Sequence, residues 1–148
     1  MNNQNNLALI AENVMVPREK VLTCTMESEL RPILQQMDEK NYTHVPILKG
    51  DEVCGILSEK TMLTIAATEG SLCNHGRTIK NIENYVSFQQ VCLEHFFDYV
   101  TPTTSLEIIK NLFAKIEEGK ERLDILIVTD NGRVTGKFLG IITPWDII

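Results

Sequence analysis

Two stretches of the chain repeat the same order of predicted elements. Apolar residues with the i, i+3, i+7 spacing of a buried helix face recur at an offset of 76: Leu30, Ile33 and Met37, then Leu106, Ile109 and Phe113. The run Gly55-Ile-Leu-Ser58 recurs as Gly140-Ile-Ile-Thr143 at an offset of 85, and longer loops in the second copy supply the difference. The repeat predicts an α/β protein with two β-α-β-β-α copies, packed about a pseudo-twofold axis so that each buries the other's sheet face.

Apolar periodicity and turn residues place the individual elements. The expected order is a helix over 7–15, a strand over 20–25, a helix from 28, strands over 42–48 and 52–57, a helix over 58–70, a strand over 98–101, a helix from 104, and strands over 123–129 and 134–142. Asp130-Asn131-Gly132 predicts a tight turn between the last two strands. We therefore expect a tail and leading helix at 1–13, a first repeat at 14–76, a connecting segment at 77–97 and a second repeat at 98–148 with a short last helix.

Charge and apolar-run length exclude several classes of protein. The chain has 148 residues, with 14 Lys+Arg against 20 Asp+Glu, and a net charge of −6 lacks the broad positive field that nucleic acid or an anionic membrane needs. The longest apolar runs are strand-sized and far shorter than the ~20 residues of a membrane-spanning helix. The asparagine-rich start lacks the charged and apolar regions of a signal peptide, which predicts a cytoplasmic protein.

The four cysteines, at positions 24, 54, 73 and 92, have no CxxC pair and no zinc-ligand spacing, so we interpret them as reduced thiols. Cys73 and His75 are interpreted as loop residues, because no second pair accompanies them to complete a metal site. Cys92 and His95 share one helix face without an orienting third group, which favours packing over a Cys-His hydrolase. The sequence therefore predicts a protein that is not an enzyme and that requires no metal.

The second copy ends in Thr143-Pro144-Trp145-Asp146, for which two interpretations stay open. A hydroxyl at the N-cap, proline at the first helical position and an acid two residues later are close to a capping box. The same arrangement suits a nucleotide, because free N–H groups attract phosphate and a carboxylate accepts hydrogen bonds from a ribose diol.

The chain resembles cystathionine-β-synthase (CBS) domains, which occur in pairs as nucleotide-sensing regulatory (Bateman) modules. The resemblance runs from Val14 to Ile148. Gly140–Asp146 matches the family's Gly-hydrophobic-hydrophobic-Thr/Ser-x-x-Asp run in full, and His44-Val45-Pro46-Ile47-Leu48 matches the strand that precedes it in the family. The stretch from Met15 to Val21 is also similar to the start of stand-alone bacterial members, some of which bind cyclic di-adenosine monophosphate.

The resemblance implies one strong nucleotide site, between the repeats. In the family the acid holds ribose, the Thr approaches phosphate, and adenine lies against strand residues of the other copy. The implied site residues are Thr143, Asp146, Tyr42, Thr43, His44 and Pro46, with Lys20, Val21 and Thr23 at the edge. Lys20 would meet phosphate, with a solvated strand-end cation as the alternative. Tyr42 would stack on the base or pack on the next helix, and His44 would bind ligand or satisfy a local hydrogen bond.

A second site is implied at Ser58, Thr61, Asp124 and Ile125, and this sequence departs from the family pattern there. Thr61 stands where the family has its acid, and a hydroxyl cannot provide the bidentate acceptor geometry of a carboxylate. The matching strand of the second copy lacks the proline and places Asp124 near the expected phosphate. Both changes predict a weak or missing second site.

These features predict a regulatory module that binds AMP, ADP, ATP or cyclic di-AMP as a ligand and signals to an effector protein. The alternative is a nucleotide-free dimerisation or protein-interaction module in which Thr143 and Asp146 only cap. We expect a homodimer formed through helix faces that carry Met62, Ile65 and Ala66. Trp145 is expected to cover the pocket or a neighbouring subunit, with core packing as the alternative.

Overall fold

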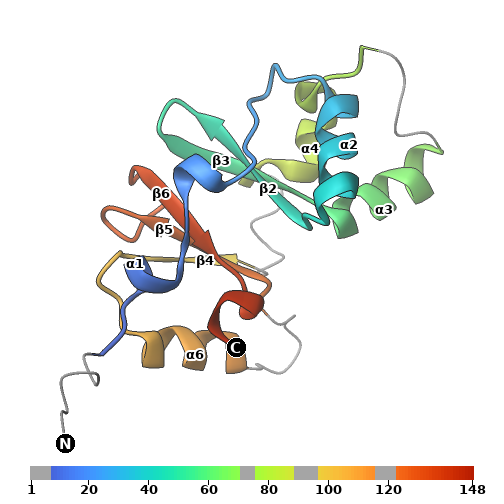
Figure 1. Cartoon of the computed structure of the whole chain (residues 1–148). Helices are drawn as coiled ribbons and strands as arrows, with labels where there is room; N and C mark the ends of the chain where they lie inside the picture. Colours follow the sequence, from blue (N-terminus) through green and yellow to red (C-terminus); the bar gives the residue numbers. More distant parts are fainter. Residues whose placement is uncertain (1–7, 71–75, 89–96, 116–122) are drawn as a thin grey trace, which may run out of the picture. The chain divides into compact units, whose positions relative to one another are not determined.

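The structure is a computed structural model that describes residues 8–70, 76–88, 97–115 and 123–148. The chain divides into two compact units (Figure 1). Leu22–Leu93 form one, here called the hairpin unit, and Met1–Val21 together with Glu94–Ile148 form the other, here called the four-strand unit. Each unit has its own apolar core. The mixed α/β fold predicted from the sequence is confirmed.

The hairpin unit is built on two antiparallel strands, β2 (His44–Lys49) and β3 (Glu52–Ser58). Two helices of the same length, α2 (Leu30–Lys40) and α3 (Glu59–Glu69), pack beside them. Both helices end where a residue enters the left-handed region, with φ of 56° at Asn41 and 75° at Gly70. Gly70 thus caps the helix that the sequence predicts over 58–70.

The core of the hairpin unit includes the apolar positions predicted for the helix from 28, together with residues of α3. Helix α2 buries Leu30, Ile33 and Met37, and α3 buries Met62 and Ile65. Strands β2 and β3 contribute further buried aliphatic residues to the same cluster. The short helices η3 (Ile79–Ile82) and α4 (Glu83–Val86) complete it.

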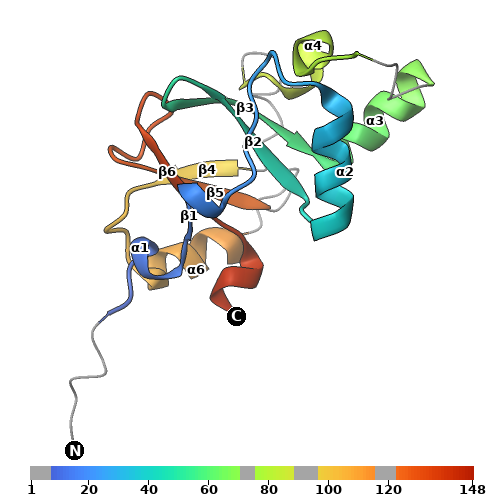
Figure 2. The same cartoon turned by 45° about the horizontal axis from the view of Figure 1, so that its top comes forward.

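The four-strand unit contains a sheet in the order β1-β6-β5-β4 (Figure 2). The strands are β1 (Val16–Pro17), β4 (Phe97–Val100), β5 (Ile125–Thr129) and β6 (Phe138–Ile142). Strands β4 and β5 are parallel, and the other two pairs are antiparallel. Helices α1 (Ala11–Val14) and α6 (Leu106–Ala114) share one core cluster with residues of β4, β5 and β6. The remaining elements are η2 (Arg18–Lys20) and η4 (Pro144–Ile147).

In each unit, the strands of one repeat pack with a segment of chain that leads into the other repeat. We call these two segments, residues 8–21 and 76–88, the leading segments. In the four-strand unit, Ile10 pairs with Ser105; in the hairpin unit, Thr78 pairs with Glu29 in the same antiparallel sense. Asparagine three residues after each leading position accepts the backbone N–H of that position, at 2.9 Å for Ile10 and 2.8 Å for Thr78. The two leading segments thus dock in the same way, although the sequence repeat does not include them.

The glycines of the repeated run explain how the leading segments reach the strands. Gly140 pairs with Pro17, and Gly55 pairs with Ser87. A Cβ at Gly140 would overlap the carbonyl oxygen of Val16, and a Cβ at Gly55 would overlap that of Val86. Only glycine allows this close backbone approach, so the fold requires it at both positions.

Two predicted strands differ from the structure. The strand expected over 20–25 is wrong: η2 ends at Lys20, and of residues 21–25 only Cys24 bridges β2, in parallel with Ile47. The strand expected over 134–142 begins at Phe138, because residues 130–137 form a loop instead of the tight turn expected at 130–132. In that loop the side-chain oxygen of Asn131 accepts the N–H of Arg133 at 2.9 Å, and an Asp130 oxygen accepts that of Lys137 at 2.9 Å.

Candidate functional site

The first candidate site lies at the start of η4, where β6 ends. Thr143 is the N-cap residue, and its backbone N–H donates to Oδ2 of Asp146 at 2.7 Å. The Thr143 hydroxyl donates to the same oxygen at 3.1 Å, and the Asp146 N–H donates back to the Thr143 carbonyl at 3.0 Å. The carboxylate is therefore held on the helix start by two donors. This is the contact that the capping interpretation predicts.

The capping contact uses only part of the carboxylate. Both side-chain bonds end on Oδ2, and within the described residues Oδ1 of Asp146 accepts no hydrogen bond. Asp146 and Thr143 are both half-buried. A held carboxylate with a remaining acceptor oxygen can bind a hydroxyl group, so capping and ligand binding are compatible at this residue.

Trp145 follows Pro144 and leaves 83% of its surface exposed. The interpretation of Trp145 as a core residue is therefore wrong. The one-turn helix turns the indole away from the core cluster of its unit, whose partly buried neighbours include Ile147.

The equivalent position in the hairpin unit is the start of α3. Ser58 is the N-cap residue and accepts the N–H of Thr61 at 3.1 Å, and the two hydroxyl oxygens lie 2.9 Å apart. The Ser58 side chain is buried, whereas Thr61 is half-buried. Thr61 thus occupies the place of Asp146 but replaces the carboxylate with a hydroxyl that is already bonded.

The strand residues of the implied site lie at the start of β2 and just before it. Tyr42 is half-buried against the core of the hairpin unit, and its N–H donates to the Met37 carbonyl at 3.0 Å. The Thr43 hydroxyl lies 2.8 Å from Nδ1 of His44, which is the local hydrogen bond anticipated for this histidine. Pro46 is buried, and its carbonyl accepts the N–H of Cys24 at 3.1 Å.

The remaining implied residues lie in short connecting segments. Lys20 is exposed at the end of η2, and Val21 and Thr23 after it are half-buried. Arg18 of the same turn is held by β6, because its guanidinium donates to the Phe138 carbonyl at 3.5 Å and lies 6.0 Å from the centre of the Phe138 ring. Asp124 is exposed, and Ile125 begins β5 as a buried residue. The structure thus joins Thr143 to Asp146, and Ser58 to Thr61, by direct hydrogen bonds.

The described thiols are poor nucleophiles. Cys24 and Cys54 are free, and burial, with Cys54 nearby, raises the pKa of Cys24 to about 12. Burial also raises the pKa of Cys54. A thiol with a raised pKa is protonated near neutral pH and reacts slowly. Cys73, His75, Cys92 and His95 lie outside the described residues, and within the described part of the chain no group of His, Cys, Asp and Glu side chains could hold a metal ion.

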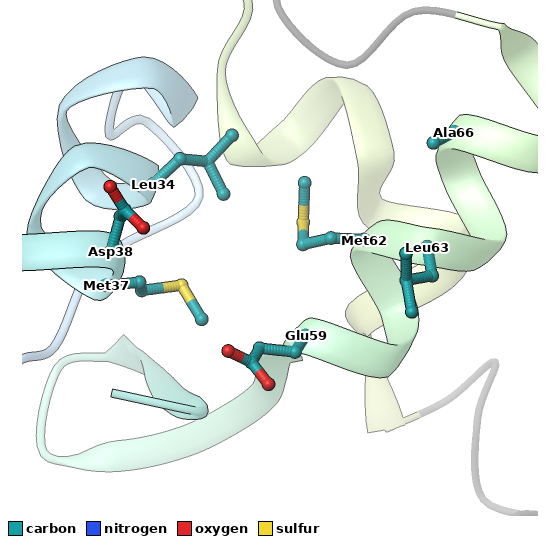
Figure 3. Close-up of a pocket in the computed structure, with 7 residues that line it drawn as sticks. All are labelled: Leu34, Met37, Asp38, Glu59, Met62, Leu63 and Ala66. Atoms are coloured by element: carbon teal, nitrogen blue, oxygen red, sulfur yellow. The ribbon is translucent and has the colours of Figure 1, made fainter. Parts of the chain in front are cut away.

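The helix residues expected to form a dimer surface are placed differently. Met62 and Ile65 belong to the core of the hairpin unit and are 7% and 0% exposed, so their assignment to an outer face is wrong. Leu63, on the same helix as Met62 (Figure 3), instead leaves 72% of its surface in solvent. A helix that packs on a core buries only one apolar face, and α3 carries more apolar residues than one face can hold: Met62, Leu63, Ile65 and Ala66. That excess is the signal by which the exposed leucine could have been found.

Comparison with known proteins identifies the fold. Residues 11–67 match the family model of the CBS domain. This segment is similar to a CBS domain. CBS-domain proteins are generally regulatory modules rather than enzymes. The resemblance drawn from Gly140–Asp146 and His44–Leu48 is confirmed, and a pair of CBS domains is consistent with it. Among curated protein sequences, none matches this chain.

Solved structures of CBS-domain proteins have the same fold over nearly the whole chain. CBSX2 in complex with AMP has a TM-score of 0.65 at 19% identity, with 94% of this chain and 92% of that chain covered. Hypoxic Response Protein I with two coordinated zinc ions has a TM-score of 0.62 at 18% identity, covering 93% and 95%. A CBS domain-containing protein of unknown function from Bacillus anthracis str. Ames Ancestor has a TM-score of 0.63 at 15% identity, covering 97% and 94%. Among the described residues, no helix is long and apolar enough to cross a membrane.

Proposed function

We propose that this CBS-domain chain is a regulatory module that binds an adenine nucleotide and signals to an effector protein. The observation that carries the proposal is the Asp146 carboxylate, which is held by Thr143 through Oδ2 while Oδ1 accepts no bond from the described residues. The similar fold of CBSX2, whose structure is a complex with AMP, supports an adenine nucleotide as the ligand.

The proposed ligand contacts follow from the chemistry of the side chains. Asp146 accepts hydrogen bonds from the ribose hydroxyls, and the Thr143 hydroxyl meets phosphate, as does the exposed ammonium of Lys20. The base lies against Tyr42, Thr43, His44 and Pro46, with Val21 and Thr23 at its edge. Within the described residues Lys20 forms no salt bridge, so its charge is available to an anion.

We propose one nucleotide per chain. The second implied site, at Ser58, Thr61, Asp124 and Ile125, has no carboxylate at its helix start, and the two hydroxyl groups there already bond each other. Asp124 would also place a negative charge beside phosphate, which is unfavourable. The proposed protein is a cytoplasmic homodimer that requires no cofactor. Its free thiols fit a reducing compartment.

A thermal-shift titration with AMP, ADP, ATP and cyclic di-AMP tests the ligand. A ligand at about 100 times its dissociation constant stabilises the folded state by roughly 2.7 kcal/mol, and each kcal/mol raises Tm by about 2–4 °C in a chain of this size. We expect a rise of several degrees with at least one nucleotide and none with GMP. No rise with any adenine nucleotide at millimolar concentration would favour the nucleotide-free interaction module, which the Thr143–Asp146 capping contact also allows.

Sedimentation velocity tests the homodimer. We expect a species of twice the 16.8 kDa chain mass at tens of micromolar protein, roughly the range in which a standard-size interface persists. A monomer at that concentration would contradict this part of the proposal and leave the nucleotide test unaffected.

A further inference from the structure

The loop between β5 and β6 carries the only Asn-Gly pair of the sequence, Asn131-Gly132. Asn131 is exposed, and Gly132 has φ of +71°, a conformation that glycine adopts without strain. The side-chain amide of an asparagine is open to attack by the backbone nitrogen of the next residue, and a glycine in that place has no Cβ to hinder the approach. The sequence thus places its least hindered asparagine side chain in this loop.

The loop holds the Asn131 side chain by its oxygen. Oδ1 accepts the backbone N–H of Arg133 at 2.9 Å and the hydroxyl of Thr129 at 3.4 Å. Within the described residues the Nδ2 group forms no hydrogen bond. Donors on a carbonyl oxygen withdraw electrons from its carbon and stabilise the oxyanion that forms when a nucleophile adds. The amide carbon is therefore activated, while the nitrogen that would leave is unrestrained.

The attacking nitrogen is weakly held. The N–H of Gly132 donates to the Thr129 carbonyl at 3.4 Å, a length at which a hydrogen bond is weak. The donor to Asn131 is fixed more firmly, because Thr129 is 1% exposed and its hydroxyl also donates to the Arg133 carbonyl at 3.1 Å. The loop therefore brings an activated carbon and an available nitrogen together in neighbouring residues.

We infer that Asn131 is a site of spontaneous deamidation in the folded chain. The Gly132 nitrogen forms a bond to Cγ of Asn131, the Cγ–Nδ2 bond breaks, and Nδ2 takes up the Gly132 proton and leaves as ammonia. A cyclic succinimide remains. Water then adds to one of its carbonyl groups and opens the ring, which gives aspartate or isoaspartate. The sum is asparagine plus water to a carboxylic acid plus ammonia, and the only co-reactant is water.

The loop tolerates the two products differently. An aspartate keeps Oδ1 and accepts the same hydrogen bonds, which its charge strengthens. An isoaspartate adds a carbon atom to the backbone where there is little room. A Cβ at Gly136 would overlap Oδ1 of Asn131, and one at Gly132 would lie 3.0 Å from Cγ2 of Thr101. Deamidation therefore adds a negative charge to older chains, and its isoaspartate form loosens the connection between β5 and β6. The inference does not depend on nucleotide binding.

Peptide mass spectrometry measures the conversion in the full-length chain, kept folded in mildly alkaline buffer at physiological temperature. We expect aspartate and isoaspartate to accumulate at Asn131. Asn81 is the internal control, because its Oδ1 also accepts two hydrogen bonds, from the N–H and the hydroxyl of Thr78 at 2.8 and 3.2 Å. The residue after Asn81 is the buried Ile82, whose branched side chain hinders the approach, so Asn81 should stay unchanged.

Substitution of Thr129 tests the activation. Thr129→Val keeps the shape of the side chain but removes the hydroxyl donor, so conversion should slow about twofold to tenfold, the range for the net contribution of one hydrogen bond. Thr129→Ser keeps the donor and should convert at the rate of the unsubstituted chain. Asn131→Asp supplies the aspartate product directly and should keep Tm, whereas the isoaspartate fraction, separated by chromatography, should melt at a lower temperature.

Two results would overturn the inference. One is conversion of Asn131 in the chain unfolded with guanidinium but not in the folded chain, which would show that the loop protects the side chain. The other is equal conversion of Thr129→Val and the unsubstituted chain, which would show that the hydroxyl donor does not assist. Circular dichroism checks that the variants are folded, and if Thr129→Val is not, the comparison of the folded and unfolded unsubstituted chain decides alone.

Discussion

The starts of α3 and η4 hold the same backbone turn with different chemistry. At α3, Ser58 and Thr61 bond through two neutral hydroxyl groups 2.9 Å apart. At η4, Thr143 donates two hydrogen bonds to the Asp146 carboxylate, at 2.7 and 3.1 Å. Since a neutral pair is sufficient to begin the longer helix, the fold does not require the charge at Asp146. The turn therefore needs only a hydrogen-bonded pair of side chains, and the negative charge of Asp146 is available for a ligand.

The glycine of the repeated run, unlike the acid, is needed in both units. Gly55 and Gly140 both meet a backbone carbonyl oxygen where a Cβ would stand, from Val86 and Val16 respectively. A feature present in both units is a requirement of the fold, and a feature present in one unit is a candidate for function. Six substitutions, in four experiments, test this distinction.

The largest effect is expected for Asp146→Asn. Asparagine can still accept the N–H of Thr143, so the turn is kept, but the charged acceptor for ribose is lost. A charge-assisted hydrogen bond contributes about 1.5–3 kcal/mol, so nucleotide affinity should fall roughly tenfold to hundredfold in isothermal titration. The free energy of unfolding should change by less than about 1 kcal/mol. Glu107→Gln, an exposed position on α6, is the control, and equal affinity of both variants would show that Asp146 only caps.

Gly55→Ala and Gly140→Ala should each lower the free energy of unfolding by about 1–3 kcal/mol, because the new methyl group displaces the leading segment. Urea denaturation measures the loss. The control is Gly50→Asn, since Gly50 has φ of +63° and nothing within 4 Å of a Cβ, and asparagine tolerates that conformation. A loss of unfolding free energy at only one of these two glycines would show that the two units do not require glycine equally.

Removal of the N-cap hydroxyl should affect α3 more than η4. Ser58 accepts the N–H of Thr61 and caps a helix of 11 residues, so Ser58→Ala should lower the unfolding free energy by about 0.5–2 kcal/mol. Thr143→Ala removes one donor from Asp146, whose bond from the Thr143 N–H remains. Thr143→Ala should therefore lower the unfolding free energy less than Ser58→Ala does, and its Tm should fall less. The reverse order would mean that η4 stabilises its unit more than its length suggests.

The smallest effect on stability is expected for Thr61→Asp, which carries the carboxylate of η4 into α3. An acid in the first turn stabilises a helix by about 0.3–1 kcal/mol. If Thr61 is the reason for the weak second site, isothermal titration should give a stoichiometry that rises toward two nucleotides per chain. An unchanged stoichiometry would assign the weakness to Asp124 and the missing proline in β5.

Local features of the structure could be predicted from the sequence, because each depends on residues close in the chain. The buried positions Leu30, Ile33 and Met37 follow from helical periodicity, and the caps at Ser58 and Gly70 follow from residue type. The Thr143–Asp146 contact joins residues three apart, so the candidate site was visible as a motif.

Only the tertiary structure decided how distant segments pair. The pairing of Ile10 with Ser105 and of Thr78 with Glu29 depends on backbone hydrogen bonds that any residue can form, so the side-chain pattern does not predict it. The single bridge between Cys24 and Ile47 likewise depends on where β2 lies, because residues 21–25 form few backbone hydrogen bonds among themselves. Leu63 is exposed because Met62 and Ile65 already fill the core beneath α3, and that competition for space is not encoded in any one residue.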